Sequence, residues 1–230
     1  MKIIGALGLG AMAALAVAGC VSGSKDAKGE KTKEVVTSET ERRLLEAGAE
    51  YRQWDRVSDR AHWAPEMCLA LPKTDSQLSE SADSSTHGGK LYYLFAKYGG
   101  TYDREIGGRP QVPQQAGQVI VKQSWTPKEV PPERGSSEQS RSIRERHSLA
   151  FAERDGKYWE PGEAKELFVM LKNDPPFYST DGGWTYAVLT PDGGRVLRAG
   201  MLRDCMGCHE KAPFDSLFGS VTARASKELR

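Results

Sequence analysis

The sequence predicts a mainly β fold of the α+β type, an antiparallel β-sandwich-like domain with an N-terminal helix and a C-terminal helical turn. Short segments rich in aromatic and β-branched residues recur between residues 90 and 197, which is typical of strands. One amphipathic helical pattern precedes these segments, and a motif of cysteine and histidine follows them. These three observations indicate a β domain flanked by helical ends.

The composition excludes several classes of partner. The chain has 230 residues, with 32 Lys and Arg against 31 Asp and Glu, so its net charge is +1. Because there is no basic excess, we expect neither a nucleic acid partner nor a polybasic membrane anchor. Five Trp, eight Tyr and six Phe are enough for a hydrophobic core, and the length suits one domain with a tail.

Residues 1–19 predict a lipoprotein signal peptide. Lys2 precedes an apolar, small-residue run that ends in Val-Ala-Gly before Cys20, which looks like a cleavage site followed by a lipidated cysteine. The alternatives are an ordinary signal peptide with an incidental Cys20, or an uncleaved anchor helix. Val21 rather than Asp follows Cys20, which favours the periplasmic side of the outer membrane over retention at the inner membrane.

Residues 20–37 are rich in Gly, Ser and Lys and predict a flexible tether, which leaves 38–230 as the folded domain. We expect a helix to begin with Ser38 as N-cap and Glu41 in capping-box register. Its apolar stripe has helical spacing and comprises Leu44, Ala47, Tyr51 and Trp54.

The strand-like segments follow this helix along the chain. They are residues 90–98, 117–125, 166–172 and 184–189. The turn at 192–194 predicts a hairpin that joins the last of them to residues 196–197. The stretch 56–89 reads as irregular, and 126–147 as a surface loop, with a helical turn as the alternative for 141–152.

The residues Cys205-Met206-Gly207-Cys208-His209 form a C-x-x-C-H motif, which is typical of covalent haem c attachment. Two thiols three residues apart on a helical turn can reach one porphyrin, and the adjacent His209 becomes the proximal iron ligand. Thioether formation outside the cytoplasm agrees with the export signal. The alternatives are a redox cysteine pair or half of a zinc site.

At this point the chain resembles the cytochrome P-460 family, which includes the β-type relatives of cytochrome c′. The resemblance covers roughly 45–219. Its motifs are Tyr51, Trp54 and Val57; His87-Gly88; Gly117 to Lys122 with Trp125; Phe168 to Met170 with Lys172 to Asp174; Gly183-Trp184; and the haem motif. The resemblance implies a β-sandwich homodimer with one haem c per chain and an open distal side. The chain departs from the family in its lipid tether, an extra segment at 56–86 and an enlarged loop at 126–160.

The resemblance also implies candidate site residues. Hydroxylamine-oxidising members carry a lysine–porphyrin bond, for which Lys122 is the candidate and Lys172 the second choice. On a strand, Lys122 shares a face with Ile120, and the alternative is a lysine that snorkels to solvent or pairs with an acid. Glu160 and Glu163 are candidates for a distal acid or base, although exposed loop glutamates are the commoner case.

Other side chains offer alternative iron ligation. His87 suits a turn residue or a second axial ligand, whereas His62 and His147 read as surface residues. Methionine ligation would indicate electron transfer, and its candidates are Met67, Met170 and Met201. Cys68 is the odd cysteine, which predicts a buried thiol or an intermolecular disulfide.

Three functions remain open at this stage. The first is an enzyme that oxidises hydroxylamine and passes electrons to a periplasmic redox partner. The second is a non-enzymatic binder of nitric oxide, and the third is a six-coordinate electron carrier. Haem binding is common to all three, so the resemblance leaves the enzymatic activity undecided.

Overall fold

The computed structural model describes residues 37–58, 60–63, 89–102, 112–145, 149–173 and 180–219. All of them belong to one structural unit, Glu34–Arg230. The predicted signal peptide and nearly all of the tether lie outside the described residues. So do Cys20, Met67, Cys68, His87 and His147. No helix in the described part of the chain is long and apolar enough to cross a membrane.

The described strands form one antiparallel sheet of eight strands, ordered β1-β3-β4-β6-β7-β8, with β2 beside β3 and β5 beside β6. The strands are β1 (Asp55–Arg56), β2 (His62–Trp63), β3 (Leu91–Ala96), β4 (Val119–Val130), β5 (Ala152–Arg154), β6 (Lys157–Lys172), β7 (Trp184–Leu189) and β8 (Val196–Gly200). The helices are α1 (Ser38–Glu50), α2 (Gly99–Tyr102), α3 (Pro132–Arg144) and α4 (Arg203–His209), with a 3-10 turn after α1 at Tyr51–Gln53. The mainly β class and the N-terminal helix are confirmed. The described strands share a single sheet, where a sandwich would have two.

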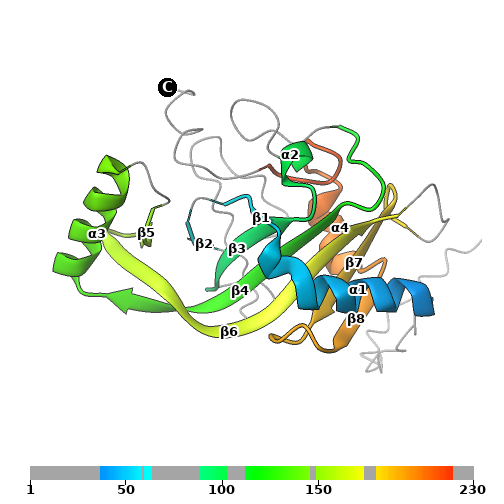
Figure 1. The fold of residues 1–230 in the computed structure, drawn as a ribbon, viewed down its shortest axis with the longest axis horizontal. Helices are drawn as coiled ribbons and strands as arrows, with labels where there is room; N and C mark the ends of the chain where they lie inside the picture. The colour runs from blue at the N-terminus through cyan, green and yellow to red at the C-terminus, as the bar shows by residue number, and fades with distance from the viewer. Residues whose placement is uncertain are drawn as a thin grey trace, which may run out of the picture. The chain divides into compact units, whose positions relative to one another are not determined.

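The α1 helix covers one face of this sheet (Figure 1). Its N-cap is Thr37, whose hydroxyl accepts a hydrogen bond from the Thr40 N–H, so the prediction of Ser38 was wrong by one residue. Leu44 and Tyr51 are fully buried, as the stripe predicted. Gly48 lies against the β7–β8 turn, because a Cβ there would meet the carbonyl oxygen of Gly193 at 2.4 Å.

The alternation of side chains along the central strands creates two different surfaces. Val121 on β4 and Val169 on β6 pack with the α1 stripe. Ile120 and Met170 point to the opposite face, where Tyr186 and the α4 helix lie. The chemistry-bearing C-terminal motif is therefore packed on the face that α1 leaves open.

Residues 126–144 of the region predicted as a loop at 126–147 lie almost entirely in a strand and a helix, so that prediction was wrong there. Strand β4 continues to Val130, α3 follows, and β6 begins at Lys157, so the two strands extend beyond the sheet as a ribbon that carries α3 and β5 at its end (Figure 1). Its prolines are compatible with this structure. Pro127 faces Pro161 beside a register shift, where missing N–H groups are tolerated, and Pro132 starts α3, a favoured position for proline.

Candidate functional site

The C-x-x-C-H motif makes up the C-terminal part of the α4 helix, which ends at His209. Because residues three apart are neighbours on a helix surface, Cys205 and Cys208 lie on one side of α4. Cys208 is buried, and Cys205 and Met206 pack against the apolar cluster on the open face of the sheet. The helix therefore presents both thiols close to one apolar surface, which suits the attachment of a large hydrophobic group.

The His209 ring is fixed by a hydrogen bond to the backbone. Its Nδ1 lies 2.7 Å from the carbonyl oxygen of Ser216. A carbonyl can only accept, so Nδ1 carries the proton and Nε2 keeps its lone pair, the form in which histidine binds a metal. Burial lowers the pKa of His209 to about 4, which also favours the neutral ring. The ring packs between Tyr186 and Phe218, each with its centroid 5.5 Å away.

The Ser216 carbonyl belongs to a tight turn directly after α4. Phe214 and Leu217 close this turn through reciprocal backbone hydrogen bonds of 3.1 and 3.0 Å. Asp215 has φ of 53° and Ser216 has φ of 65°, in the left-handed region that residues other than glycine rarely adopt. Such a conformation persists only where the surrounding structure holds it, so the contacts of this turn determine where the Ser216 carbonyl points.

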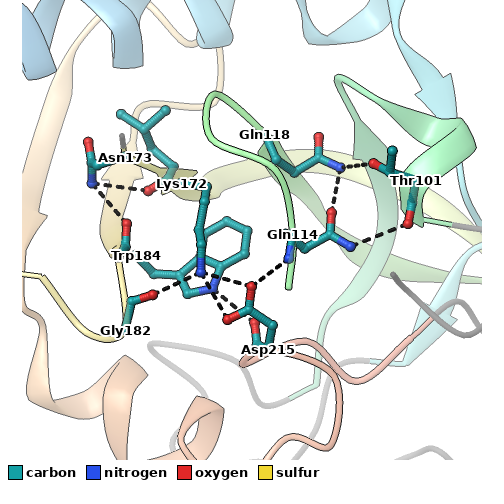
Figure 2. A network of polar contacts seen from close by, with 10 residues as sticks. Thr101, Gln114, Gln118, Lys172, Asn173, Gly182, Trp184 and Asp215 are labelled. Carbon is teal, nitrogen blue, oxygen red and sulfur yellow. Dashed lines mark hydrogen bonds and ion pairs between the residues drawn. The ribbon is translucent and has the colours of Figure 1, made fainter. Parts of the chain in front are cut away.

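Asp215 is the centre of those contacts (Figure 2). Its carboxylate accepts two hydrogen bonds from Lys172 Nζ, at 2.9 and 2.8 Å, and one from the Gln114 N–H at 2.8 Å. Its backbone carbonyl accepts a fourth from Trp184 Nε1 at 2.9 Å. Gln118 extends the network by donating to Gln114 Oε1 at 2.9 Å. The turn beside His209 is thus tied to three separate segments of the chain.

The two candidate lysines have different surroundings. Lys122 lies on the open face, with Nζ 4.5 Å from the centroid of the Tyr92 ring and 5.9 Å from that of Phe168. Its positive charge contributes to the lowered pKa of His209, after burial as the main cause. Lys172 is buried, and its Nζ also donates to the Gly182 carbonyl at 2.8 Å, so its donors are used within the protein.

The structure does not bring Glu160 and Glu163 to this site. Glu160 pairs with Lys128 and Arg134 at 3.0 and 3.1 Å on the ribbon, and these contacts lower its pKa, with the Lys128 hydrogen bond as the largest cause. Lys128 lies six positions beyond Lys122 on β4, or roughly 20 Å along the strand. Glu163 is exposed beside Lys165. We therefore assign neither glutamate to the chemistry.

The remaining candidates are placed as follows. The prediction that His62 is a surface residue was wrong, because it is 4% exposed on β2 with its ring 6.0 Å from Tyr92. Met170 is buried in the cluster on the open face, and Met201 is partly exposed before α4. No group of three or more His, Cys, Asp and Glu side chains within the described ranges has the geometry to hold a metal ion.

Sequence reasoning missed Asp215 and Ser216, which fix the histidine. Only their position in the sequence could have indicated them, because both follow His209 within seven residues. Their partners Gln114 and Lys172 come from distant segments, so no local pattern announces the network.

The donor set fits a covalently bound haem. Two cysteines lie on one side of a helix, the adjacent imidazole has its Nε2 available, and apolar side chains surround them. These are the groups that hold haem c. The described residues therefore meet the chemical requirements of the cofactor that the motif predicts.

Comparison with known proteins agrees with this fit. A family model described as cytochrome P460 matches residues 107–218, a range that includes Lys122, Lys172 and the whole C-x-x-C-H motif. No curated protein matches the chain. The family match supports haem c as the cofactor. Over residues 107–218 this chain is therefore similar to the cytochrome P460 family.

Proposed function

We propose that this protein is an exported, lipid-anchored cytochrome with one haem c per chain and an open distal side. It binds and oxidises small nitrogen species, with hydroxylamine as the substrate and a periplasmic protein as the electron acceptor. The proposal rests on the family match over residues 107–218 and on the chemistry of the C-x-x-C-H motif.

The observation that carries the proposal is the hydrogen bond between His209 Nδ1 and the Ser216 carbonyl. It leaves Nε2 as the metal-binding nitrogen at the end of the helix that bears Cys205 and Cys208. Metal-binding histidines usually donate their other ring N–H in this way, which fixes the tautomer and raises the basicity of the ligand. A histidine with a purely structural role has no need of that arrangement beside two cysteines.

The chain's own residues have separate roles in this proposal. Cys205 and Cys208 anchor the cofactor, and His209 supplies the proximal nitrogen. Lys122 is the candidate for a bond to the porphyrin, because it shares the open face with Ile120 and its charge acts on His209. Lys172 drops to a structural role, since Asp215 and Gly182 hold its ammonium group. When bound, haem supplies an iron centre that coordinates the nitrogen ligand and accepts its electrons.

The optical spectrum tests this function. Protein secreted together with a haem maturation system should carry covalent haem and be high-spin in the ferric form. A colourless protein without tetrapyrrole mass contradicts haem binding. A low-spin ferric spectrum at neutral pH contradicts the open distal side and favours the six-coordinate electron carrier. Turnover of hydroxylamine with an added electron acceptor then separates the enzyme from the nitric oxide binder.

The lysine–porphyrin bond has its own test. Lys122→Ala should change the mass of the haem peptide complex and the ferric spectrum if Lys122 forms the bond. Lys128→Ala is a matched control, because Lys128 lies on the same strand but on the exposed ribbon. Identical haem adducts in Lys122→Ala and the parent protein would remove Lys122 and favour the nitric oxide binder.

Lipid anchoring at Cys20 is supported by the small residues before it and by the requirement for haem attachment outside the cytoplasm. Labelled fatty acid should be incorporated into the parent protein, and the protein should fractionate with outer membranes. Cys20→Ala should lose the label. Labelling of Cys20→Ala equal to the parent would contradict this anchor. The homodimer that the family resemblance implies is tested by the mass of the delipidated protein in solution.

A further inference from the structure

We propose that Lys172 and Asp215 are positioning residues for His209. Their ion pair holds the Phe214–Leu217 turn so that the Ser216 carbonyl accepts the His209 Nδ1–H, and this contact sets the donor strength of the imidazole toward the iron. The inference rests on the proposed function, because it concerns the haem that His209 would bind. It assigns a redox-tuning role to two residues that do not touch the cofactor motif directly.

The ion pair is buried and well formed. Lys172 and Asp215 have side chains only 10% and 15% exposed, and Lys172 Nζ lies 2.9 and 2.8 Å from the two carboxylate oxygens. Figure 2 shows the lysine and the Trp184 indole converging on Asp215. A buried charge pair that satisfies this many hydrogen bonds resists displacement, because each broken bond leaves a desolvated group.

The ion pair acts on His209 through the backbone, because Ser216, whose carbonyl lies against His209 Nδ1, directly follows Asp215. Asp215 and Ser216 are consecutive, and both have positive φ, so the peptide between them is held in an orientation that the turn alone does not favour. Trp184 Nε1 donates to the Asp215 carbonyl at 2.9 Å, and the Ser216 carbonyl lies 2.7 Å from His209 Nδ1. The hydrogen bonds to the Asp215 carboxylate and to the Asp215 carbonyl therefore both hold the stretch of backbone that leads to the Ser216 carbonyl.

The hydrogen bond between His209 and Ser216 would affect the reduction potential of the bound iron. A short hydrogen bond from Nδ1 to a carbonyl makes the imidazole a stronger donor, which stabilises ferric over ferrous iron. If the turn relaxes, this bond lengthens and the donor weakens. The equilibrium then shifts toward ferrous iron, and the reduction potential rises.

The test uses the haem-loaded protein and five variants, one of which, Lys172→Arg, restores the cation. Asp215→Asn and Lys172→Met remove the ion pair, and Trp184→Phe removes the indole donor while keeping an aromatic ring. Glu166→Gln is the matched control, because it breaks another part-buried pair, with Lys90 at 3.1 Å, that lies outside the network. The measurements are the haem content by alkaline pyridine spectrum, the reduction potential, and the iron–histidine stretching frequency of the ferrous protein.

We expect covalent haem in all variants. In the three network variants the ferric–ferrous equilibrium should move up to about tenfold toward ferrous, a rise of up to about 59 mV, and the stretching frequency should fall. Lys172→Arg, which keeps the cation, should return both values toward the parent. Glu166→Gln should leave both unchanged.

Two kinds of failure are distinguishable. A parent protein without haem overturns the proposed function and this inference with it. A haem-loaded parent whose network variants keep the parental potential and stretching frequency overturns only the positioning role, even if those variants are less stable. Should Asp215→Asn yield no folded protein, Lys172→Met and Trp184→Phe decide by the same criteria.

Discussion

Lys172 Nζ lies 2.8 Å from Asp215 Oδ2, across 43 positions of sequence and with both side chains largely buried. This ion pair distinguishes the two lysines, Lys122 and Lys172, that the sequence analysis offers as candidates for a bond to the porphyrin. Lys172 holds the turn behind His209, whereas Lys122 lies on the open face over the Tyr92 ring. Lys122 is therefore the lysine that we propose for chemistry on the open face, and Lys172 is the one that we propose as a positioning residue for His209.

Loss of the Lys172 ammonium should strongly destabilise the fold. Lys172→Met leaves the Asp215 carboxylate buried without its cation, and breaking such a pair costs about 3 kcal/mol or more. Urea unfolding measures the free energy difference. Lys157→Met is the control, because its pair with Glu129 at 3.0 Å is exposed and should contribute at most about 1 kcal/mol. Equal effects of the two substitutions would show that Lys172 is not held as the structure indicates.

A methyl group at Gly48 should destabilise the protein although it improves helix propensity. Gly48→Ala gains about 1 kcal/mol of intrinsic helix preference, but its Cβ would meet the Gly193 backbone at 2.4 Å, a contact that forces α1 away from the β7–β8 turn. We expect a net loss of about 1–2 kcal/mol, as for an overpacked core.

Thermal unfolding measures this loss. The matched control is Gly100→Ala in α2, where a Cβ meets no atom within 4 Å. A Gly48→Ala protein as stable as the parent would contradict the close packing of α1 on that turn.

The sequence predicts regular elements where one periodicity dominates. The α1 stripe is correct because burial on one face imposes a period of 3.6 on the residue pattern. The four strand segments are correct because buried strands favour aromatic and β-branched residues, and β7 is buried at every position. The 126–160 region misleads because its prolines and charges resemble a loop. In the structure Pro127 lies opposite Pro161 beside a register shift of the ribbon, and Glu160 pairs with both Lys128 and Arg134.

The candidate site likewise has one part that the sequence predicts and one part that it does not. Cys205, Cys208 and His209 are recognisable because their spacing is itself the chemical requirement. Asp215 escapes recognition because its partners come from three segments, and only the antiparallel register of β6 and β7 brings Lys172 and Trp184 together. Such convergence carries no local sequence signal.

Acid should loosen the ribbon through Glu160. Lys128 and Arg134 hold the pKa of Glu160 below its ordinary value of 4.5, so the unfolded state takes up protons first as the pH falls. The stabilisation is complete above about pH 4.5 and is lost as the pH drops through the lower, folded pKa. We expect Glu160→Gln to abolish up to about 1 kcal/mol of this acid sensitivity.

The helical circular dichroism signal, to which α3 contributes, and urea unfolding are measured at several pH values to check this prediction. Glu163→Gln is the control, because the Glu163 side chain is exposed and its carboxylate pairs with Lys165 at 3.6 Å rather than with Lys128 or Arg134. The same acid sensitivity in Glu160→Gln and in the parent would contradict it.

The haem-free protein should lose stability in weak acid because of His209. Burial lowers the pKa of His209 to about 4 from its usual 6.5, so between these values the unfolded chain binds a proton that the folded chain does not. Stability therefore rises with pH across this window and falls as the pH drops from about 6.5 toward about 4. From about pH 7 to about pH 5 we expect a loss of about 2 kcal/mol from this residue.

Urea unfolding of haem-free protein at these two pH values, alongside His209→Gln, isolates the effect. The amide of glutamine does not titrate, so the variant should show a pH dependence smaller by about 2 kcal/mol. Haem-loaded protein should resist acid further, because a metal bond to Nε2 competes with the proton. If His209→Gln and the parent lose equal stability in acid, the imidazole is not held buried and neutral against the Ser216 carbonyl, and the proximal geometry described above is incorrect.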